Sequence, residues 1–326
     1  MNITGFFGDG NWYKGNIHCH TTNSDGKLSP AQVAQAYREH GYSFLAISDH
    51  DIYSDYRQEL DREDFIILPA MEASAVLYKE EGKPERICVH HMQALLGTKL
   101  MQEQAKKGLL THLEKYPPRI FYESWDGAQV AQEMQDDLKA HGFVTTYNHP
   151  VWSRVREKEF INLEGISALE IYNYGTVEES GTGFDSIHWD VMLRNGKKVW
   201  AFASDDNHND GILEDSFGGY IVVKAEKLEH EAIIKAIMDG NYYSSSGPEI
   251  YDWGIKDGMA YVECSPVERV NFVCGNYINA GTTVIGKDGM LTRAEFSLKG
   301  NESYIRVECM DQCGKTAWTN PIFLEF

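Results

Sequence analysis

The chain has 326 residues, of which 42% are hydrophobic and 24% are charged, and its formal net charge is -19 at pH 7. This length allows one large domain and a smaller one with a well-buried core. The acidic balance argues against a nucleic-acid polymer as partner, because such binding needs a basic surface, but it does not exclude a small anionic substrate.

No stretch approaches the roughly 18 apolar residues that a membrane span needs, so no membrane partner is expected. The first residues lack the basic start and apolar core of a secretory signal, which predicts a cytoplasmic protein. The six cysteines form no Cys-x-x-Cys pair and are expected to be reduced thiols. Cys309 and Cys313 have a spacing that could bind zinc, but a strand and its turn explain it more simply. The sequence leaves the oligomeric state open.

Up to Gly247 the sequence alternates strand-like and helix-like segments, a pattern typical of an α/β domain with parallel strands. One helix is expected to begin at Ser29-Pro30, where Gln32 completes a capping box, and to end before Gly41. Further helices are expected over 130–138 and 228–240. The expected strands are 15–18, 44–48, 65–68, 87–95, 143–147, 168–172 and 199–203.

Seven such units predict a β/α barrel, in which the loops leaving every strand meet at the C-terminal mouth. Residues 97–125 fit no unit and are interpreted as an insertion beside that mouth. From residue 248 the pattern changes to short alternating runs, with Asp257-Gly258 and Asp288-Gly289 as turn signals. We therefore predict two domains, residues 1–247 and a small antiparallel, sandwich-like β domain over 248–326.

Metal-ligand residue types follow six of the strand-like runs. Imidazole and carboxylate groups are ligands of zinc, iron and manganese, and they can share ions only where the strand ends converge. A barrel mouth provides that convergence, so the pattern predicts a multi-metal hydrolase. In chain order the candidates are His18, His20 and Asp25; Asp49 and His50; Glu72; His90 and His91; His149; and Asp205, Asp206 and His208.

Local geometry ranks some of these candidates. His18 and His20 alternate along an extended backbone and therefore point the same way. Only one of His90 and His91 can face inward, and the strand-end pattern favours His91. Glu72 ends an apolar run, where an unpaired buried carboxylate would be too costly without a partner or a metal.

The ordered motifs resemble those of the polymerase and histidinol phosphatase (PHP) superfamily over residues 11–247. The matching residues are His18-x-His20, Ser24-Asp25-Gly26, Ser48-Asp49-His50, Glu72, His91, Asn148-His149-Pro150 and Asp206-x-His208. The resemblance implies a distorted seven-stranded β/α barrel that holds two or three divalent ions, usually zinc, iron or manganese. The stretch Ser204-Asp205-Asp206-Asn207-His208 has one residue more than the usual motif, so which aspartate ligates stays open.

The resemblance divides the ligands into three edges: His18, His20, Glu72 and Asp206; Asp25, His50 and His208; and His91 with His149. The tail is similar to the β-rich appendage of some hydrolases of this superfamily, on Tyr243-x-Ser245-x-Gly247-Pro248 and Ala317-Trp318-Thr319-Asn320-Pro321. It does not identify the substrate.

The predicted activity is a metal-dependent phosphoesterase that hydrolyses a small phosphorylated metabolite or nucleotide, with a metal-bridged hydroxide as nucleophile. His50 or His208 could protonate the leaving group, and Arg154 or Arg194 could bind the phosphate. An alternative is hydrolysis of a carboxylic or carbamoyl ester by the same cluster; a convergent Arg or Lys pair near the metals would favour the phosphate. A non-enzymatic binding protein is a third hypothesis, disfavoured by the number of candidate ligands.

Overall fold

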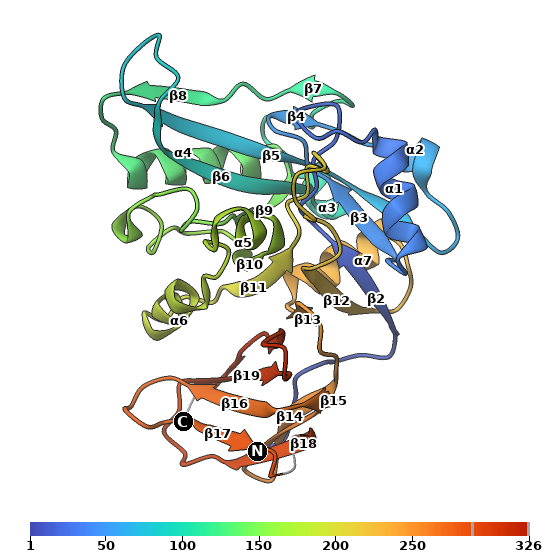
Figure 1. Ribbon diagram of the computed structural model, residues 1–326, viewed down its shortest axis with the longest axis vertical. Helices are drawn as coiled ribbons and strands as arrows, with labels where there is room; N and C mark the ends of the chain where they lie inside the picture. The colour runs from blue at the N-terminus through green and yellow to red at the C-terminus, as the bar shows by residue number, and fades with distance from the viewer. Residues whose placement is uncertain (288–289, 325–326) are drawn as a thin grey trace.

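The computed structural model describes residues 1–287 and 290–324. The predicted turn at Asp288-Gly289 and the last two residues of the predicted β domain lie outside these ranges. The fold is mixed α/β and rich in strands. The described residues form one large sheet of 15 strands, a four-stranded sheet and a two-stranded sheet. Figure 1 shows the helices around the upper part of the molecule and the C-terminal strands below it.

Seven strands of the large sheet correspond to the seven expected runs, and they lie in the order β11-β10-β9-β6-β5-β3-β2. Most neighbours are parallel, but β6 pairs antiparallel with both β5 and β9. Their bounds are β2 (Asn11–Asn16), β3 (Phe44–Ile47), β5 (Ile66–Tyr78), β6 (Arg86–Leu96), β9 (Phe143–Tyr147), β10 (Ala168–Asn173) and β11 (Trp200–Ser204).

The two end strands of this order approach each other just past their C-terminal ends. Cys19 and Asn207 form an isolated parallel bridge. The backbone N of Asp206 donates to the carbonyl of His18 at 3.0 Å, and that of His20 to the carbonyl of Asn207 at 3.0 Å. A continuous ladder does not join β2 to β11 in the described residues, and β6 breaks the parallel arrangement. The mixed α/β prediction is confirmed, whereas the seven-stranded β/α barrel is not.

The expected helices form, with ends set by their caps. In α1 (Pro30–Glu39) the side chain of Ser29 accepts from the backbone of Gln32, the side chain of Gln32 returns the bond, and Gly41 follows with φ +77°. The other two expected helices are α4 (Gly127–Ala140) and α7 (His230–Met238). Further helices are α2 (Arg57–Leu60), α3 (Lys99–Glu103), α5 (Tyr174–Ser180), α6 (Ser186–Arg194) and the 3-10 turn η1 (Glu157–Glu159).

The segment 97–125, expected to be an insertion, contributes α3 and two short strands. β7 (Glu114–Lys115) pairs with β4 (Ile52–Tyr53), and β8 (Arg119–Tyr122) pairs with the outer half of β5. β8 thus extends the edge of the β5–β6 hairpin, which runs across the upper part of Figure 1, whereas β4 and β7 form a separate two-stranded sheet. The chain then returns to the sheet through α4.

The C-terminal strands are antiparallel, as expected, and form two layers. One layer is the sheet β1-β14-β15-β18, which includes the N-terminal strand β1 (Ile3–Thr4). The other continues the large sheet from β12 (Tyr220–Ala225) and β13 (Tyr242–Ser245), because β20 pairs with β13. The bounds are β14 (Ile250–Lys256), β15 (Met259–Val267), β16 (Arg269–Cys274), β17 (Thr282–Ile285), β18 (Leu291–Ser297), β19 (Tyr304–Met310), β20 (Thr316–Thr319) and β21 (Ile322–Phe323).

The C-terminal strands share buried contacts with the first part of the chain. Tyr304 and Trp318 belong to the same apolar cluster as Trp189 on α6. The side chain of Asn320 accepts from the backbone N of Ala201 on β11 at 2.9 Å and donates to the carbonyl of Gly240. The division at residue 247 therefore stays a prediction. Among the described residues, no helix combines the length and apolar character that crossing a membrane requires.

Candidate metal centre

Buried imidazoles and carboxylates meet where the central strands end. His18 and His20 follow β2, Glu72 lies on β5 and Asp206 follows β11; the side chain of each is at least nine-tenths buried. His18 Nε2 lies 3.1 Å from Glu72 Oε1 and 3.1 Å from Asp206 Oδ1, and His20 Nε2 lies 2.9 Å from Asp206 Oδ1. These four side chains lie together as one edge of a cluster.

Glu72 also joins His50 and His91. Its Oε2 lies 2.8 Å from His50 Nδ1 and its Oε1 lies 3.2 Å from His91 Nδ1. His50 and Glu72 form a backbone bridge, and Asp51 turns the chain beside them with φ +54°. The carboxylate of Asp51 accepts from the backbone N of Ser74 at 2.8 Å, which fixes the loop after β3 against β5.

Asp25 and His208 complete the cluster on its solvent side. His208 Nε2 lies 3.5 Å from Asp25 Oδ1, and His50 Nε2 lies 3.6 Å from Asp25 Oδ2. The loop that carries Asp25 is held by Asp49, which accepts from the backbone N of Thr21 at 2.7 Å and the hydroxyl of Ser24 at 2.8 Å. Asp49 therefore positions the loop that carries the candidate ligand Asp25.

His149 closes the remaining side. Its Nε2 lies 3.3 Å from Glu72 Oε1 and 3.6 Å from Asp206 Oδ2, while its Nδ1 hydrogen-bonds the hydroxyl of Ser153 at 3.0 Å. The Nδ1 of His208 similarly donates to the carbonyl of Asp206 at 2.9 Å. In both rings the outer nitrogen is engaged by the protein, which directs Nε2 at the cluster.

The cluster fits divalent transition-metal ions. Several buried atoms have no hydrogen-bond partner within the described part of the chain: His18 Nε2, both ring nitrogens of His20, His50 Nδ1, Glu72 Oε2 and His91 Nδ1. Four groups of donors each lie within 4.8 Å of one another. Ligands about 2.0–2.1 Å from one ion lie roughly 3–3.5 Å apart, as many of these atoms do. The mixed nitrogen and oxygen set suits zinc, iron or manganese.

The pKa values show how tightly these charges are coupled. Burial opposes ionisation of Glu72, but His91, His18 and His50 outweigh it and hold its pKa well below the usual range. Burial, together with His50 and His208, lowers the pKa of His20 to about 4. Burial lowers the pKa of His18, but Asp206 and Glu72 outweigh it and hold that pKa well above the usual range. Metal binding requires neutral imidazoles and ionised carboxylates, so it would displace the proton of His18.

Three further polar residues support the cluster and were not among the predicted site residues. Glu170 is buried on β10; its Oε1 accepts from His18 Nδ1 at 2.9 Å and its Oε2 from the backbone N of His149 at 2.9 Å. Asn148 Nδ2 donates to Glu72 Oε1 at 2.7 Å, and Asn173 Nδ2 to Asp206 Oδ2 at 3.0 Å. The signal for Glu170 was visible in the sequence as a lone charge inside an apolar strand.

Three of the candidates lie outside the cluster: Asp49, which holds the loop of Asp25, and Asp205 and His90. Asp205 must be corrected: its carboxylate faces away and accepts from the Tyr37 hydroxyl at 2.6 Å and from three successive backbone amides, 217–219. Asp206 takes the inward place because the chain turns at this residue with φ +53°. His90 faces the opposite side from His91, where it bonds the Tyr147 hydroxyl at 2.5 Å. The preference for His91 agrees with this geometry.

A cleft of about 420 Å³ opens over the cluster. The predicted phosphate-binding arginines are not among its lining residues: Arg154 is exposed, and Arg194 bonds Asp190 on its own helix at 2.9 Å. The cations that do line the cleft are Lys27 and Arg86. Sequence reasoning missed both, because Lys27 lies in a loop and Arg86 lies five residues before His91. The wall also includes Trp152, Thr176, Glu179, Asp210, Leu213 and Asp215.

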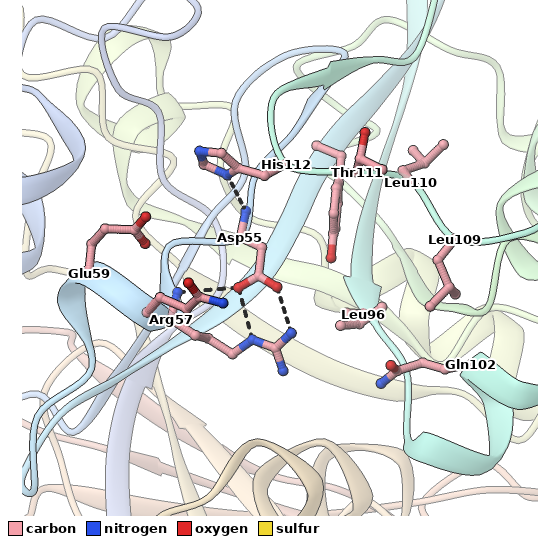
Figure 2. Close-up of a pocket in the computed structure, with 11 residues that line it drawn as sticks. Asp55, Arg57, Glu59, Leu96, Gln102, Leu109, Leu110, Thr111 and His112 are labelled. Carbon is pink, nitrogen blue, oxygen red and sulfur yellow. Dashed lines mark hydrogen bonds and ion pairs between the residues drawn. The ribbon is translucent and has the colours of Figure 1, made fainter.

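A second cleft of about 730 Å³ lies between the segment after β4 and the 96–112 segment (Figure 2). Arg57 is paired with Asp55 there, and the backbone N of Asp55 donates to His112 Nδ1 at 3.0 Å. Leu96 and Leu109 form part of its apolar side. Its lining residues include none of the candidate ligands, so it is separate from the metal cluster.

No family model matches the sequence, and no curated protein matches it. Among the solved structures that are similar to it are the following three. A two-domain protein from Bacteroides vulgatus, containing a predicted PHP-like metal-dependent phosphoesterase, is 11% identical with a TM-score of 0.44 over 98% of this chain and 96% of that one. A Bifidobacterium adolescentis protein provisionally assigned as a metal-dependent phosphoesterase is 15% identical, with a TM-score of 0.40 over 63% and 90%.

An amidohydrolase from Chromobacterium violaceum, with sulfate and no metal bound, is 13% identical with a TM-score of 0.39 over 62% of this chain and 89% of that one. With TM-scores below 0.5, these similarities decide nothing about the activity of this chain, which must be argued from its own site.

Proposed function

We propose that the chain belongs to the PHP superfamily and is a metal-dependent phosphoesterase of small phosphate esters, with two or three zinc, manganese or iron ions. The observation that carries this proposal is the convergence of the candidate ligands other than Asp49, His90 and Asp205 on one cluster, several of whose buried atoms have no hydrogen-bond partner among the described residues. A structural zinc site is closed by four ligands, whereas this set has more donors and opens into a cleft. Both features support an open, multinuclear centre.

When bound, the ions would act as Lewis acids on the phosphoryl group and provide a nucleophile near neutral pH by lowering the pKa of water. The chain's own residues would orient the substrate and move protons. Burial lowers the pKa of His208, but Asp25 and Asp206 outweigh this and raise it to about 9. A protonated His208, where it does not ligate, could protonate the leaving group, and His50 is the alternative acid.

A cation beside the cluster favours a phosphate ester over a carboxylic or carbamoyl ester. Lys27 Nζ lies 3.2 Å from the carbonyl of Asp25, and Lys27 lines the cleft over the cluster. A phosphate monoester has two negative charges at neutral pH, and cations beside the metals stabilise the oxygens that stay on phosphorus. An uncharged ester offers them no comparable contact. The cleft volume suits a small molecule.

The proposal is tested first by metal content. Protein purified from metal-supplemented medium should hold two or three transition-metal ions per chain by elemental analysis and should hydrolyse an aryl phosphate. His20→Ala and His149→Ala should remove that turnover while circular dichroism stays unchanged. His112→Ala is the matched control, since this exposed imidazole lies in the second cleft. Metal-free wild-type protein, or full activity in both cluster variants, would remove the assignment.

A further inference from the structure

Arg86 is turned onto the face of the cluster by a β-bulge. Ser74 pairs with His91, and the antiparallel pairing continues without interruption to Leu77, which pairs with Cys88. Tyr78 then pairs with Arg86, so β6 has one extra residue at this point. Because alternate residues share a face, Tyr78 lies on the side of Ser74, and its partner Arg86 lies on the side of His91.

The side chain of Arg86 is exposed, and its guanidinium has no acceptor among the described residues. No hydrogen bond or ion pair joins it to another residue in the ranges that the structure describes. The acids of the same wall are engaged: Glu179 accepts from the indole N of Trp152 at 2.6 Å, and Asp215 accepts from the backbone N of His208 at 2.6 Å. Asp210 accepts from the backbone N of Ile212 at 2.8 Å. Each of these acids is thus held by a donor of the protein, whereas the guanidinium of Arg86 is left to bind an anion.

Arg86 lies too far from the metal cluster to share its phosphate. Its partner Tyr78 is four residues from Ser74 along β5, and four residues of strand span about 13 Å. The extended arginine side chain covers only part of that distance toward His91. A ring-sized unit fits into the remainder. The cleft thus presents ion-binding groups at one end and a free guanidinium at the other.

We propose that Arg86 is a specificity-determining residue that binds a second anionic group of the substrate, one ring-sized unit away from the scissile phosphate. This inference rests on the proposed phosphoesterase function and names its substrate class: small phosphate esters with a further carboxylate or phosphate. A planar guanidinium donates two parallel hydrogen bonds to either group. The second anion takes no part in bond breaking, so its contribution appears in substrate binding and selectivity.

The test compares phenyl phosphate with 4-carboxyphenyl phosphate, which differ by one anionic group. Wild-type enzyme should prefer the carboxylated substrate in kcat/KM, chiefly through KM. Arg86→Gln should remove roughly 10- to 100-fold of that preference while kcat/KM for phenyl phosphate stays within about twofold. Arg86→Lys should retain part of the preference, because it keeps the charge and loses the planar fork. A 4-phosphonophenyl phosphate arm shows whether carboxylate or phosphate is favoured.

Arg154→Gln is the matched control, since Arg154 is an exposed arginine outside the cleft lining and should leave both substrates unaffected. Equal losses for both substrates in Arg86→Gln, or no loss for either, would overturn the inference while leaving the phosphoesterase in place. If wild-type protein hydrolyses neither phosphate, the proposed function fails. Calorimetric binding of phenylphosphonate and 4-carboxyphenylphosphonate to metal-loaded protein then decides on Arg86 alone, and equal affinities in wild type and Arg86→Gln reject it.

Discussion

Replacing Glu170 by Gln tests whether the buried carboxylate behind His18 maintains the metal centre. Four donors converge on this carboxylate: His18 Nδ1 and the Ser204 hydroxyl on Oε1, and the backbone N of His149 and Asn173 Nδ2 on Oε2. Glutamine has nearly the same shape but offers one oxygen and one amino group. In either orientation the amino group of the glutamine faces two donors. The substitution therefore removes hydrogen bonds but creates no cavity.

The magnitude follows from those contacts. A buried donor that loses its acceptor costs about 1–3 kcal/mol, so the metal-free protein should lose stability in that range. The carboxylate also holds His18 in the tautomer that presents Nε2, and removing such a partner weakens metal binding by roughly 10- to 100-fold. Both effects should occur together, because the same oxygen atoms fix His18 and the backbone of His149.

Chelator competition measures the metal affinity, and urea unfolding of the metal-free protein measures the stability. Glu178→Gln is the matched control, because Glu178 is an exposed glutamate on α5, close in sequence to Glu170. It should change neither quantity. An unchanged metal affinity in Glu170→Gln, with full metal content after dialysis, would show that the hydrogen bond to His18 does not matter for ligation. A loss of stability alone would limit Glu170 to a structural role.

Two further predictions concern the imidazoles of the cluster. With a pKa of about 9, His208 is protonated in the metal-free protein at neutral pH. Metal affinity at the subsite of His208 should therefore fall about tenfold for each pH unit below 9. Calorimetry in buffers of different ionisation enthalpy measures the proton released on metal binding, and the absence of release would contradict this prediction. His91→Phe should lose bound metal, because His91 lies beside Glu72 in the cluster. His90→Phe should keep full metal content, and its free energy of unfolding should fall by only about 1 kcal/mol through the lost bond to Tyr147. The reverse result in elemental analysis would make His90 the ligand.

The sequence indicated candidate ligands because most of them follow an apolar run, but it could not provide the pairing of those runs. Phe143–Tyr147 appears as predicted in β9, since an apolar run bounded by Gly142 and Asn148 leaves little choice. The strand before Glu72 was expected over 65–68, yet β5 continues to Tyr78, because it forms a long antiparallel hairpin with β6. Periodicity identifies strands and their faces, and it does not give the direction of a neighbour.

The site residues that sequence reasoning missed depend on contacts between distant segments. Glu170 meets His18 across 152 positions of sequence, and no local pattern reports that contact. Arg86 stands at an odd spacing from His91, for which simple alternation predicts the opposite face. Only the bulge in β6 reverses that expectation. The extra residue at Asp205-Asp206 is a similar case, because the turn at Asp206 decides which carboxylate faces inward.

Three residues at the cluster have left-handed backbone conformations that turn the chain after a strand. Asp51, His149 and Asp206 all have positive φ, at 54°, 25° and 53°, and each is a candidate ligand or the neighbour of one. Such conformations cost of order 1–3 kcal/mol in residues other than glycine and persist only where surrounding contacts determine them. Here those contacts are hydrogen bonds from Ser74 to Asp51, from His149 to Glu170 and from Asp206 to the carbonyl of His18. The strand ends are thus bent so that imidazoles and carboxylates lie within coordination distance, and bound ions would stabilise a geometry that the backbone alone disfavours.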